Sequence, residues 1–349
     1  MSMNIDSFKI SSDSEPFIIA EAGINHNGEI DKALDMIRVA KNAGANAIKF
    51  QAFKASGIVA DSSLTYTYKS KGKTITESQM DLFRRCELDR EDFLKIKKEC
   101  VKEGILFLAT PENRSDLDLL LEIGIPAIKV GSDDFINIPL LKNYSTTGLP
   151  LIISCGMANL SEINETLNAI NSIKNYPIVL MLATSSYPTL PQDVNLLKFK
   201  TLSKSFPNLI LGYSDHTQGF LASSLAVMFG AKVFEKHFTL DKTLLGPDHW
   251  FSEDPNGLKN WVDSIKTAHV MLGTSEVIPT KDEEGMKKIA RRSIIALIDI
   301  EQNETLNKNN IGIRRPGTGL PPIMFEEILG KKSTNKILKG QLLKLEDFR

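Results

Sequence analysis

The sequence predicts an α/β fold, a (β/α)₈ TIM barrel followed by a small β-rich domain. Three observations support this fold class. Eight short apolar runs recur along the chain, amphipathic segments lie between them, and polar or charged residues stand at the end of every run. Parallel strands that are covered on both faces give near-continuous apolar runs, and eight strand–helix units in about 250 residues match a closed barrel. An open doubly wound sheet is the alternative, but no GxGxxG motif follows the first run.

Each apolar run is expected to form one strand of the barrel. In chain order the runs are residues 17–20, 46–50, 105–110, 127–130, 150–154, 177–184, 209–214 and 232–238. Helical periodicity between the runs predicts helices at residues 30–43, 78–102, 160–173, 194–205, 219–229 and 257–272. Residues 56–77 are polar and show no periodicity, so we expect a long functional loop there, such as a lid.

Changes in pattern divide the chain into four segments. Residues 1–16 are expected to be an N-terminal extension or hairpin, 17–275 the barrel, 276–288 a polar linker, and 289–349 a small β-rich domain. The last segment holds short apolar runs and turns, but too few residues for another strand–helix unit. A domain of about 60 residues is near the lower limit for independent stability, so we expect it to pack on another surface.

The composition is that of a soluble globular protein. Of 349 residues, 42% are hydrophobic and 24% charged, and the net charge of −1 gives no field that would attract nucleic acid or an acidic membrane. No apolar run approaches the roughly 20 residues of a membrane span, and the polar start has no signal-peptide core. We therefore expect a cytoplasmic protein. Its cysteines, Cys86, Cys100 and Cys155, lack ligand spacing and are expected to be free thiols.

Polar residues at the strand ends are the candidates for a site. In a TIM barrel the catalytic groups come from the carboxyl ends of the strands and the loops that follow. Taken in chain order, these positions hold Glu21, Lys49, Gln51, Thr110, Lys129, Ser132, Ser154, Gly156, Ser185, Tyr187, Ser214, His216 and His237. The opposite ends of the runs show no such concentration of polar residues, so the sequence predicts one site at the mouth of the barrel.

His216 and His237 are candidates for a metal site. They lie about one strand–helix unit apart, so both are expected at the ends of adjacent strands. Two imidazoles leave several coordination positions open, as in a site that polarises a substrate oxygen. Mn²⁺ fits such a site with oxygen ligands, and Mg²⁺ and Co²⁺ are alternatives. Asp215 and Glu235 would orient the ligands. The competing interpretation is a pair of hydrogen-bonded structural histidines.

Two lysines indicate an anion pocket beside these histidines. Lys49 and Lys129 each end an apolar run, where a lysine points into the barrel mouth or outward past a helix. With Ser132, Ser154, Ser214 and the amide of Gly156, they would bind a phosphate or carboxylate group. Glu21 is an acid on an otherwise apolar run, and it either pairs with a lysine or transfers a proton.

At these residues the sequence resembles the sialic acid synthase family, which includes the N-acetylneuraminate, legionaminic acid and pseudaminic acid synthases. The motifs that carry the resemblance are IIAEAGINHNG (18–28), IKFQ (48–51), IKVGS (128–132), SCGM (154–157), YPT (187–189), GYSDHT (212–217), EKHFTLDK (235–242), GPDH (246–249) and RRPGTG (314–319). They run from the first strand into the last domain, and several are long and distinctive.

The resemblance implies a barrel followed by an antifreeze-like (SAF) domain, and a reaction between phosphoenolpyruvate and an open-chain N-acyl mannosamine-type aldehyde. By matching motif positions, His216 and His237 would bind the metal. The residues that would hold phosphoenolpyruvate are Lys49, Thr110, Lys129, Ser132, Ser154, Gly156 and Ser214. Glu21, Gln51, Tyr187 and Asp248 would face the sugar or the reacting centre. Arg315 matches an arginine that reaches the partner subunit's site, which implies a domain-swapped homodimer.

Two positions depart from the family pattern. Asp133-Asp134 stands where the family often has Gly-Glu, so Asp134 would meet the sugar with a shorter side chain. Ser185 replaces an amide that often ends the sixth strand. Both changes affect the acceptor more than the reaction. The start AEAGINHNG is closer to the N-acetylneuraminate and legionaminic branches. Alternatives are a pseudaminic acid or spore-coat-polysaccharide synthase, a 2-keto-sugar-acid lyase, a metal-dependent hydrolase, and a non-catalytic carbohydrate-binding protein.

Overall fold

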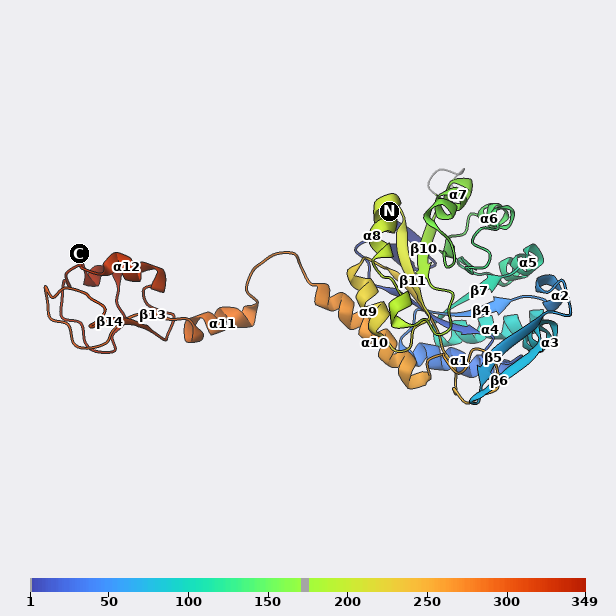
Figure 1. The fold of residues 1–349 in the computed structure, drawn as a ribbon, viewed down its shortest axis with the longest axis horizontal. Helices are drawn as coiled ribbons and strands as arrows, with labels where there is room; N and C mark the ends of the chain where they lie inside the picture. Colours follow the sequence, from blue (N-terminus) through green and yellow to red (C-terminus); the bar gives the residue numbers. More distant parts are fainter. Residues whose placement is uncertain (1, 171–175) are drawn as a thin grey trace. The chain divides into compact units, whose positions relative to one another are not determined.

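The computed structural model describes residues 2–170 and 176–349 (Figure 1). The chain divides into two compact units, Met1–Gly273 and Thr274–Arg349. The first unit confirms the predicted barrel, because eight parallel strands close on themselves in one sheet. In order around the barrel they are β3 (Phe17–Gly23), β4 (Ala47–Ala52), β7 (Leu106–Pro111), β8 (Ile128–Val130), β9 (Leu151–Ser154), β10 (Ile178–Ala183), β11 (Ile210–Asp215) and β12 (Val233–His237).

Burial on both faces explains why the strands read as continuous apolar runs. Every residue of β3, β9, β10 and β11 is buried. One cluster of apolar side chains fills the space between the strands and the helices around them. A second fills the interior at the amino ends of the strands, where it includes Phe17, Val179 and Val233. The barrel is therefore a packed core that leaves only its carboxyl ends for a site.

A hairpin covers the amino-end interior. Strands β1 (Ser2–Ile5) and β2 (Phe8–Ser11) pair antiparallel around Asp6, whose φ is 52°. Ile5 and Ile10 from this hairpin are almost fully buried in the inner cluster. The hairpin thus seals the end of the barrel opposite the strand ends that carry the polar residues.

Helices surround the barrel as the alternating pattern predicts. They are α1 (Ile30–Ala43), α3 (Gln79–Cys86), α4 (Arg90–Glu103), α5 (Arg114–Ile123), α6 (Ile138–Ser145), α7 (Leu160–Ile170), α8 (Lys198–Ser205), α9 (Leu221–Met228) and α10 (Pro255–Leu272). Residues 171–173 of the helix predicted at 160–173 lie outside the described residues. Among the helices of residues 2–170 and 176–349, none is both long and apolar enough to cross a membrane.

Two of the predicted helix boundaries are wrong. The helix predicted at 78–102 is two helices, because the side chain of Asp89 accepts a hydrogen bond from the amide of Asp92 and starts α4 with a capping box. The helix predicted from residue 194 begins only at Lys198, since Asn195 adopts a φ of 51° that a helix does not tolerate. Local capping and turn chemistry therefore override the apolar periodicity at both places.

The segment 56–77 is not the long irregular loop that its polarity predicts. After the short helix α2 (Ala55–Ile58), strands β5 (Thr65–Ser70) and β6 (Lys73–Ser78) form an antiparallel hairpin. Lys71 and Gly72 make its two-residue turn with φ of 50° and 72°. Alternating threonine and tyrosine in TYTYKS was the signal for a strand, since both residue types favour sheets.

The second unit has a small core of its own. Strands β13 (Ser293–Ala296) and β14 (Ile311–Arg314) pair antiparallel, and isolated bridges add further pairing. Helix α12 (Phe325–Ile328) closes one side of a cluster that includes Ile294, Ile300 and Ile337. Part of the segment expected to be an irregular linker is helical, because Thr280 and Glu283 form a capping box that starts α11 (Lys281–Ala290).

Candidate active site

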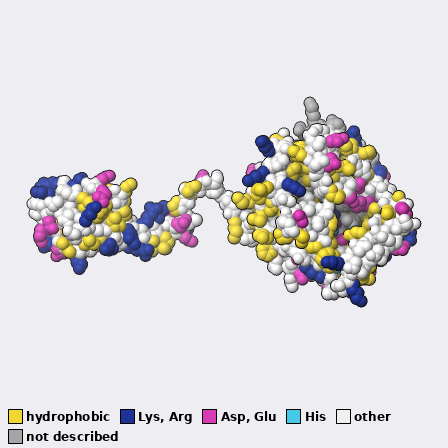
Figure 2. Space-filling view, viewed as in Figure 1, with side chains coloured by type: hydrophobic (Ala, Val, Ile, Leu, Met, Phe, Trp, Pro, Cys, Tyr) yellow, Lys and Arg dark blue, Asp and Glu magenta, His cyan; other side chains and the backbone are white. Residues whose placement is uncertain are grey.

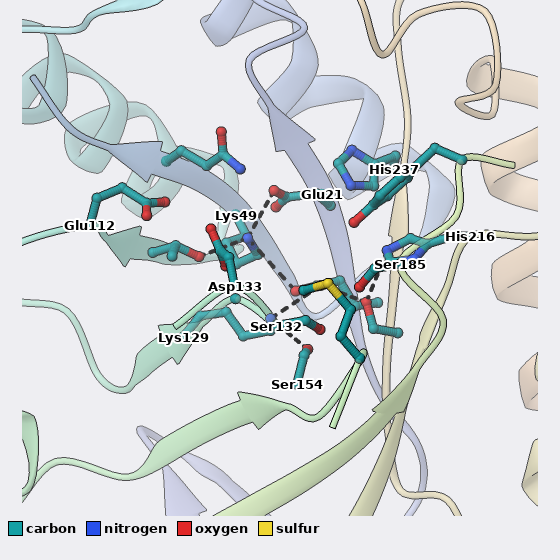
Figure 3. Close-up of a pocket in the computed structure, with 17 residues that line it drawn as sticks. Glu21, Lys49, Glu112, Lys129, Ser132, Asp133, Ser154, Ser185, His216 and His237 are labelled. Carbon is teal, nitrogen blue, oxygen red and sulfur yellow. Dashed lines mark hydrogen bonds and ion pairs between the residues drawn. The ribbon is translucent and has the colours of Figure 1, made fainter. Parts of the chain in front are cut away.

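A cavity of about 290 Å³ lies at the carboxyl ends of the barrel strands (Figure 3). Side chains from the ends of all eight strands, or from the loops after them, line it. The lining residues are Glu21, Lys49, Gln51, Thr110, Glu112, Lys129, Gly131, Ser132, Asp133, Ser154, Met157, Ser185, Tyr187, Ser214, His216, Glu235 and His237. Because parallel strands all end on the same side of a barrel, residues far apart in the sequence meet here.

Glu235 on β12 lies between the two lysines of the cavity. Its Oε2 is 3.8 Å from the Nζ of Lys49, and its Oε1 is 3.4 Å from the Nζ of Lys129 and accepts a hydrogen bond from Ser214 at 3.0 Å. All three charged residues are less than 5% exposed. Burial raises the pKa of Glu235, but Lys129 and Lys49 outweigh it and hold this pKa at about 2. Glu235 is thus the charge that keeps both lysines stable inside the barrel.

Glu21 shares Lys49 with Glu235. Its Oε1 is 2.8 Å from the Nζ of Lys49, which also donates a hydrogen bond to Thr110 at 2.9 Å. The other carboxylate oxygen, Oε2, is buried and has no hydrogen-bond partner. Burial, opposed by Lys49 and reinforced by Glu235, raises the pKa of Glu21 to about 7. A carboxyl group with that pKa can both accept and donate a proton near neutrality.

Hydroxyl groups and one backbone amide surround the second lysine. Lys129 donates hydrogen bonds to Ser154 at 2.9 Å and to the carbonyl of Val130 at 3.1 Å. The amide of Gly156 donates to the Oγ of Ser132 at 3.0 Å. A Cβ on Gly156 would lie 2.6 Å from that Oγ, so the approach of the loop requires glycine. Ammonium, hydroxyl and amide donors together form the setting in which proteins bind phosphate and carboxylate groups.

His216 and His237 meet at the rim of the cavity, with ring centroids 5.7 Å apart. His216 uses Nδ1 to donate to the carbonyl of Thr184 at 2.8 Å, so the lone pair of the ring lies on Nε2, which is 3.4 Å from the Oγ of Ser214. The Nδ1 of His237 is buried without a hydrogen-bond partner, and the nearest carboxylate oxygen, on Asp248, is 3.9 Å away. Burial lowers the pKa of both rings, with His216 lowering that of His237 further.

This arrangement fits a metal ion. Metal binding requires a neutral imidazole, and a carbonyl that accepts the proton of the other ring nitrogen fixes the tautomer. Among residues 2–170 and 176–349, no group of three or more histidine, cysteine or acidic side chains could hold an ion. Protein ligands would therefore be few, and the remaining positions would be open to substrate oxygens.

Comparison with known proteins identifies the chain. Residues 36–277 match the NeuB family, which is more than half of the sequence, and residues 291–349 match the SAF domain. The chain belongs to the NeuB family. Like the other members it is a nonulosonic acid synthase, a transferase that uses phosphoenolpyruvate, and the family uses a divalent metal. The small β-rich unit is the SAF domain that the resemblance implied.

Relatives of this NeuB-family synthase are named for different products. It is 38% identical over 332 residues to N,N'-diacetyllegionaminic acid synthase of Legionella pneumophila, covering 94% of this chain and 93% of that protein. It is 33% identical over 348 residues to pseudaminic acid synthase of Campylobacter jejuni, covering 99% and 100%. The crystal structure of N-acetylneuraminic acid synthetase from Leptospira borgpetersenii matches with a TM-score of 0.74 and 35% identity, covering 82% and 95%. Family membership therefore leaves the sugar acceptor open.

Most side chains predicted from the sequence line the cavity of the NeuB barrel. They are Glu21, Lys49, Gln51, Thr110, Lys129, Ser132, Ser154, Ser185, Tyr187, Ser214, His216 and His237. Gly156 lies directly behind Ser132 and Ser185. Asp248 lines an adjoining hollow with Tyr66, Gln51 and Tyr187, and burial raises its pKa to about 7. The β5–β6 hairpin forms a side of that hollow through Tyr66.

One predicted residue, Asp134, does not line the cavity, and another, Arg315, belongs to the second unit. Asp134 is not among the lining residues, because its Oδ1 accepts a hydrogen bond from the Nδ2 of Asn137 at 2.8 Å. Its neighbour Asp133 lines the cavity instead. Arg315 is exposed in the SAF unit, next to a cis peptide bond to Pro316.

Sequence reasoning missed Glu112, Asp133 and Met157 as lining residues. Glu112 is the first residue after β7, so the rule that strand ends carry the site could have found it. Pro111 before it indicates the end of a strand, so the residue that follows was not counted among the strand-end positions. Asp133 lies in the loop after the fourth strand, where the direction of a side chain does not follow from sequence spacing.

We predict that Glu235→Gln destabilises the barrel. Loss of the carboxylate leaves Lys129 without an acidic partner and weakens the surroundings of Lys49, and breaking a buried ion pair typically costs about 3 kcal/mol. Urea denaturation should show that decrease in the free energy of unfolding. The control is Glu165→Gln on the exposed face of α7, which should change stability by less than about 0.5 kcal/mol. Equal free energies of unfolding for the two variants would contradict the role of Glu235 in stabilising the buried lysines.

Proposed function

We propose that this chain condenses phosphoenolpyruvate with an open-chain N-acyl mannosamine-type aldehyde and water, and releases phosphate. The observation that carries the proposal is the single cavity in which two buried lysines, balanced by Glu235, lie beside a pair of neutral histidines. One half of such a cavity suits the phosphate and carboxylate of phosphoenolpyruvate. The other half suits a metal and an aldehyde oxygen. A legionaminic or N-acetylneuraminic type of product is our preference, with a pseudaminic or spore-coat type as the alternative.

Phosphoenolpyruvate would bind over the lysines. Lys49 and Lys129 supply positive charge, and the surrounding hydroxyl and amide groups add hydrogen bonds of fixed direction. The residues proposed for this role are Lys49, Thr110, Lys129, Ser132, Ser154, Gly156 and Ser214. Because these donors are already held in place by one another, little side-chain freedom is lost when the substrate binds.

A divalent metal would be held by His216 and His237, with Mn²⁺ preferred and Mg²⁺ or Co²⁺ as alternatives. When bound, it supplies Lewis acidity toward the aldehyde oxygen of the sugar. The protein fixes the tautomer of His216 through Thr184 and keeps both rings neutral through burial. Tyr187 packs against the His216 ring at 4.2 Å between centroids and helps to exclude water from this side.

Catalysis then rests on positioning and on proton transfer. The methylene carbon of phosphoenolpyruvate attacks the aldehyde carbon, water adds to the carbon that bears phosphate, and the resulting tetrahedral adduct expels phosphate. The water loses a proton and the aldehyde oxygen gains one. Glu21 is proposed to move a proton in this sequence, since its carboxyl group is anchored by Lys49 and titrates near neutrality. Gln51, Ser185, Tyr187 and Asp248 are proposed to contact the sugar.

The assembly is proposed to be a domain-swapped homodimer in which Arg315 enters the partner's site. Arg315 is exposed in the SAF unit and has no acidic partner within 4 Å among the described residues. A guanidinium group can bind several polar groups of a sugar at once and helps to exclude water. The proposal gives the SAF domain a direct part in sugar binding.

The test of the proposed reaction is release of phosphate. Purified protein with phosphoenolpyruvate and Mn²⁺ should release inorganic phosphate when an N-acyl mannosamine-type sugar is added, and mass spectrometry of the product identifies the acceptor. Phosphoenolpyruvate alone, and the sugar alcohol that lacks an aldehyde, are the controls. Failure with every aldehyde would contradict the proposal. Covalent trapping of the substrate on a lysine by borohydride would favour the lyase alternative instead.

We predict that His216→Ala weakens Mn²⁺ binding at least tenfold, because one of two protein ligands is lost. Titration calorimetry of the protein with Mn²⁺, followed without substrates, measures the effect independently of turnover. His269→Ala, on the far helix α10, is the matched control and should bind Mn²⁺ as the wild type does. Unchanged Mn²⁺ affinity in His216→Ala would rule out the histidine pair as the metal site.

We predict that Arg315→Ala lowers kcat/KM for the sugar at least tenfold while the dimer persists. Steady-state kinetics gives the first value, and sedimentation equilibrium gives the mass of the assembly. Arg349→Ala, which removes another exposed arginine of the SAF unit, should leave both unchanged. Full activity of Arg315→Ala would mean that the SAF domain lies away from the site.

A further inference from the structure

The segment after β12 folds back on itself beside the cavity. Its two ends are joined, because the amide of Thr239 donates to the carbonyl of Glu253 at 2.8 Å and the amide of Glu253 donates to the carbonyl of His237 at 3.0 Å. We call residues 239–252 the β12 loop. Asp248 lies on this loop and lines the hollow that adjoins the cavity. Figure 2 shows acidic side chains beside the hollow in this face of the barrel.

Two asparagines from the loop after β3 hold the β12 loop. Asn25, which is 1% exposed, donates from Nδ2 to the carbonyl of Phe238 at 2.8 Å and to the Oγ of Ser252 at 3.0 Å, so it joins the two ends. Asn27 donates from Nδ2 to the carbonyl of Leu245 at 3.0 Å, in the middle of the loop. Both asparagines belong to the motif AGINHNG, and the proposed reaction gives neither of them a role.

His249 completes this set of contacts from inside the β12 loop. It is 1% exposed, with its Nδ1 2.7 Å from the Oγ1 of Thr239 and its Nε2 3.3 Å from the Oδ1 of Asn27. Because the amide oxygen of Asn27 only accepts, Nε2 carries the proton and Nδ1 accepts from the Thr239 hydroxyl. That hydroxyl also lies 3.1 Å from the carbonyl of Asp241, but its single proton goes to the ring, where the contact is shorter. Burial lowers the pKa of His249 to about 4, so the neutral ring that these contacts require is the form present at neutral pH.

The ring of His249 also packs against the turn that precedes it. A Cβ on Gly246 would lie 2.8 Å from the ring Cδ2, and Gly246 has a φ of 154°, so only glycine lets the backbone pass this close to the imidazole. The amide of Gly246 donates to the Oγ of Ser70 on β5 at 3.4 Å. His249 therefore lies where the loop after β3, the β12 loop and the β5–β6 hairpin meet.

The carboxylate of Asp248 has no such support of its own. Within residues 2–170 and 176–349, no group donates a hydrogen bond to it, and its Oδ2 is 3.9 Å from the Nδ1 of His237. Its direction therefore follows from the backbone that carries it. Two contacts fix that backbone. The hydroxyl of Ser252 donates to the carbonyl of Asp248 at 2.6 Å, and the next residue, His249, is anchored through its ring.

We propose that His249 is a positioning residue for the sugar acceptor, because its contacts with Asn27 and Thr239 hold the carboxylate of Asp248 in the hollow. This inference rests on the proposed function, which assigns Asp248 to the sugar. His249 lines neither the cavity nor the adjoining hollow, so it acts through Asp248 and does not touch the substrate.

General support of the fold is the competing role for His249, and the contacts argue against it. The ends of the β12 loop are already joined by two backbone hydrogen bonds and by Asn25. His249 adds contacts within the loop, next to Asp248, so its loss releases one segment while the barrel strands stay paired. None of the residues proposed to bind phosphoenolpyruvate lies on β12 or its loop. The effect of that loss is therefore expected on the sugar half of the site.

The first experiment compares two replacements of His249 at saturating Mn²⁺. His249→Leu has a similar volume and no polar atom, while His249→Gln keeps one donor and one acceptor. The probes are N-acetylmannosamine and 2,4-diacetamidomannose, each with phosphoenolpyruvate, and phosphate release gives kcat and KM. For the probe that the wild type uses better, His249→Leu should raise KM for the sugar about fivefold or more and change KM for phosphoenolpyruvate less than about twofold. His249→Gln should restore most of the lost kcat/KM.

A double-mutant cycle tests whether His249 acts through Asp248. Asp248→Asn alone should raise KM for the sugar at least as much as His249→Leu does. Adding His249→Leu to Asp248→Asn should lower kcat/KM for the sugar less than about twofold further, because the carboxylate that His249 holds is already gone. Losses that multiply in the double variant would overturn the proposal, since they would mean that His249 acts independently of Asp248.

Asn27→Gly removes the same contacts from the other side. Asn27 has a φ of 54°, a conformation that glycine also adopts, so this variant is expected to fold. It should raise KM for the sugar as His249→Leu does, and it decides the question if His249→Leu fails to fold. Asn303→Gly is the matched control, because it makes the same substitution at another asparagine with a positive φ, 67°, and it should leave both KM values unchanged.

Two further results would overturn the positioning role and leave the synthase proposal standing. One is a parallel rise in KM for the sugar and for phosphoenolpyruvate in His249→Leu and Asn27→Gly, which would mean a general disturbance of the site. The other is an unchanged KM for the sugar in both variants. A wild type that releases phosphate with no sugar aldehyde would contradict the synthase proposal itself, and the role of His249 in sugar binding would fall with it.

Discussion

The contact on which the site depends is that of Glu235 with Lys49 and Lys129. Two ammonium groups inside a barrel are unstable without a counter-charge, since burial strips their water. One carboxylate within 4 Å of both removes most of that cost and leaves each lysine with donors that still point into the cavity. Glu21 and Ser214 bind to the same set. The anion pocket can therefore form before any substrate binds. The carboxylate that stabilises its two lysines, Glu235, comes from a different strand, β12.

The closed barrel is what makes this contact available. Parallel strands that close in a ring bring their carboxyl ends to one rim, and the hairpin β1–β2 with its buried isoleucines seals the other end. Stability is thus concentrated where no chemistry occurs. The rim is free to hold charges, unpaired polar atoms and neutral histidines that would weaken a core elsewhere.

Electrostatics divides the rim into two parts. The lysines and hydroxyls favour anions, and the histidine pair favours a metal. Different strands contribute these parts, but the parts are coupled, because burial lowers the pKa of His237 while Glu235 and both lysines also act on it.

The sequence by itself determined the barrel, the strand ends that carry the site, and the histidine and lysine pairs. It could do so because strand period, strand number and the common direction of parallel strands are local or topological properties. It did not determine the hairpin β5–β6, the helix α11 inside the expected linker, or which of Asp133 and Asp134 faces the cavity. Only the tertiary structure decided that Glu235 joins both lysines and that Glu112 is left unpaired. The direction of a side chain in a loop and the balance of charges across neighbouring strands both depend on packing between residues that lie far apart in the sequence. Their spacing along the chain does not reveal which of them meet.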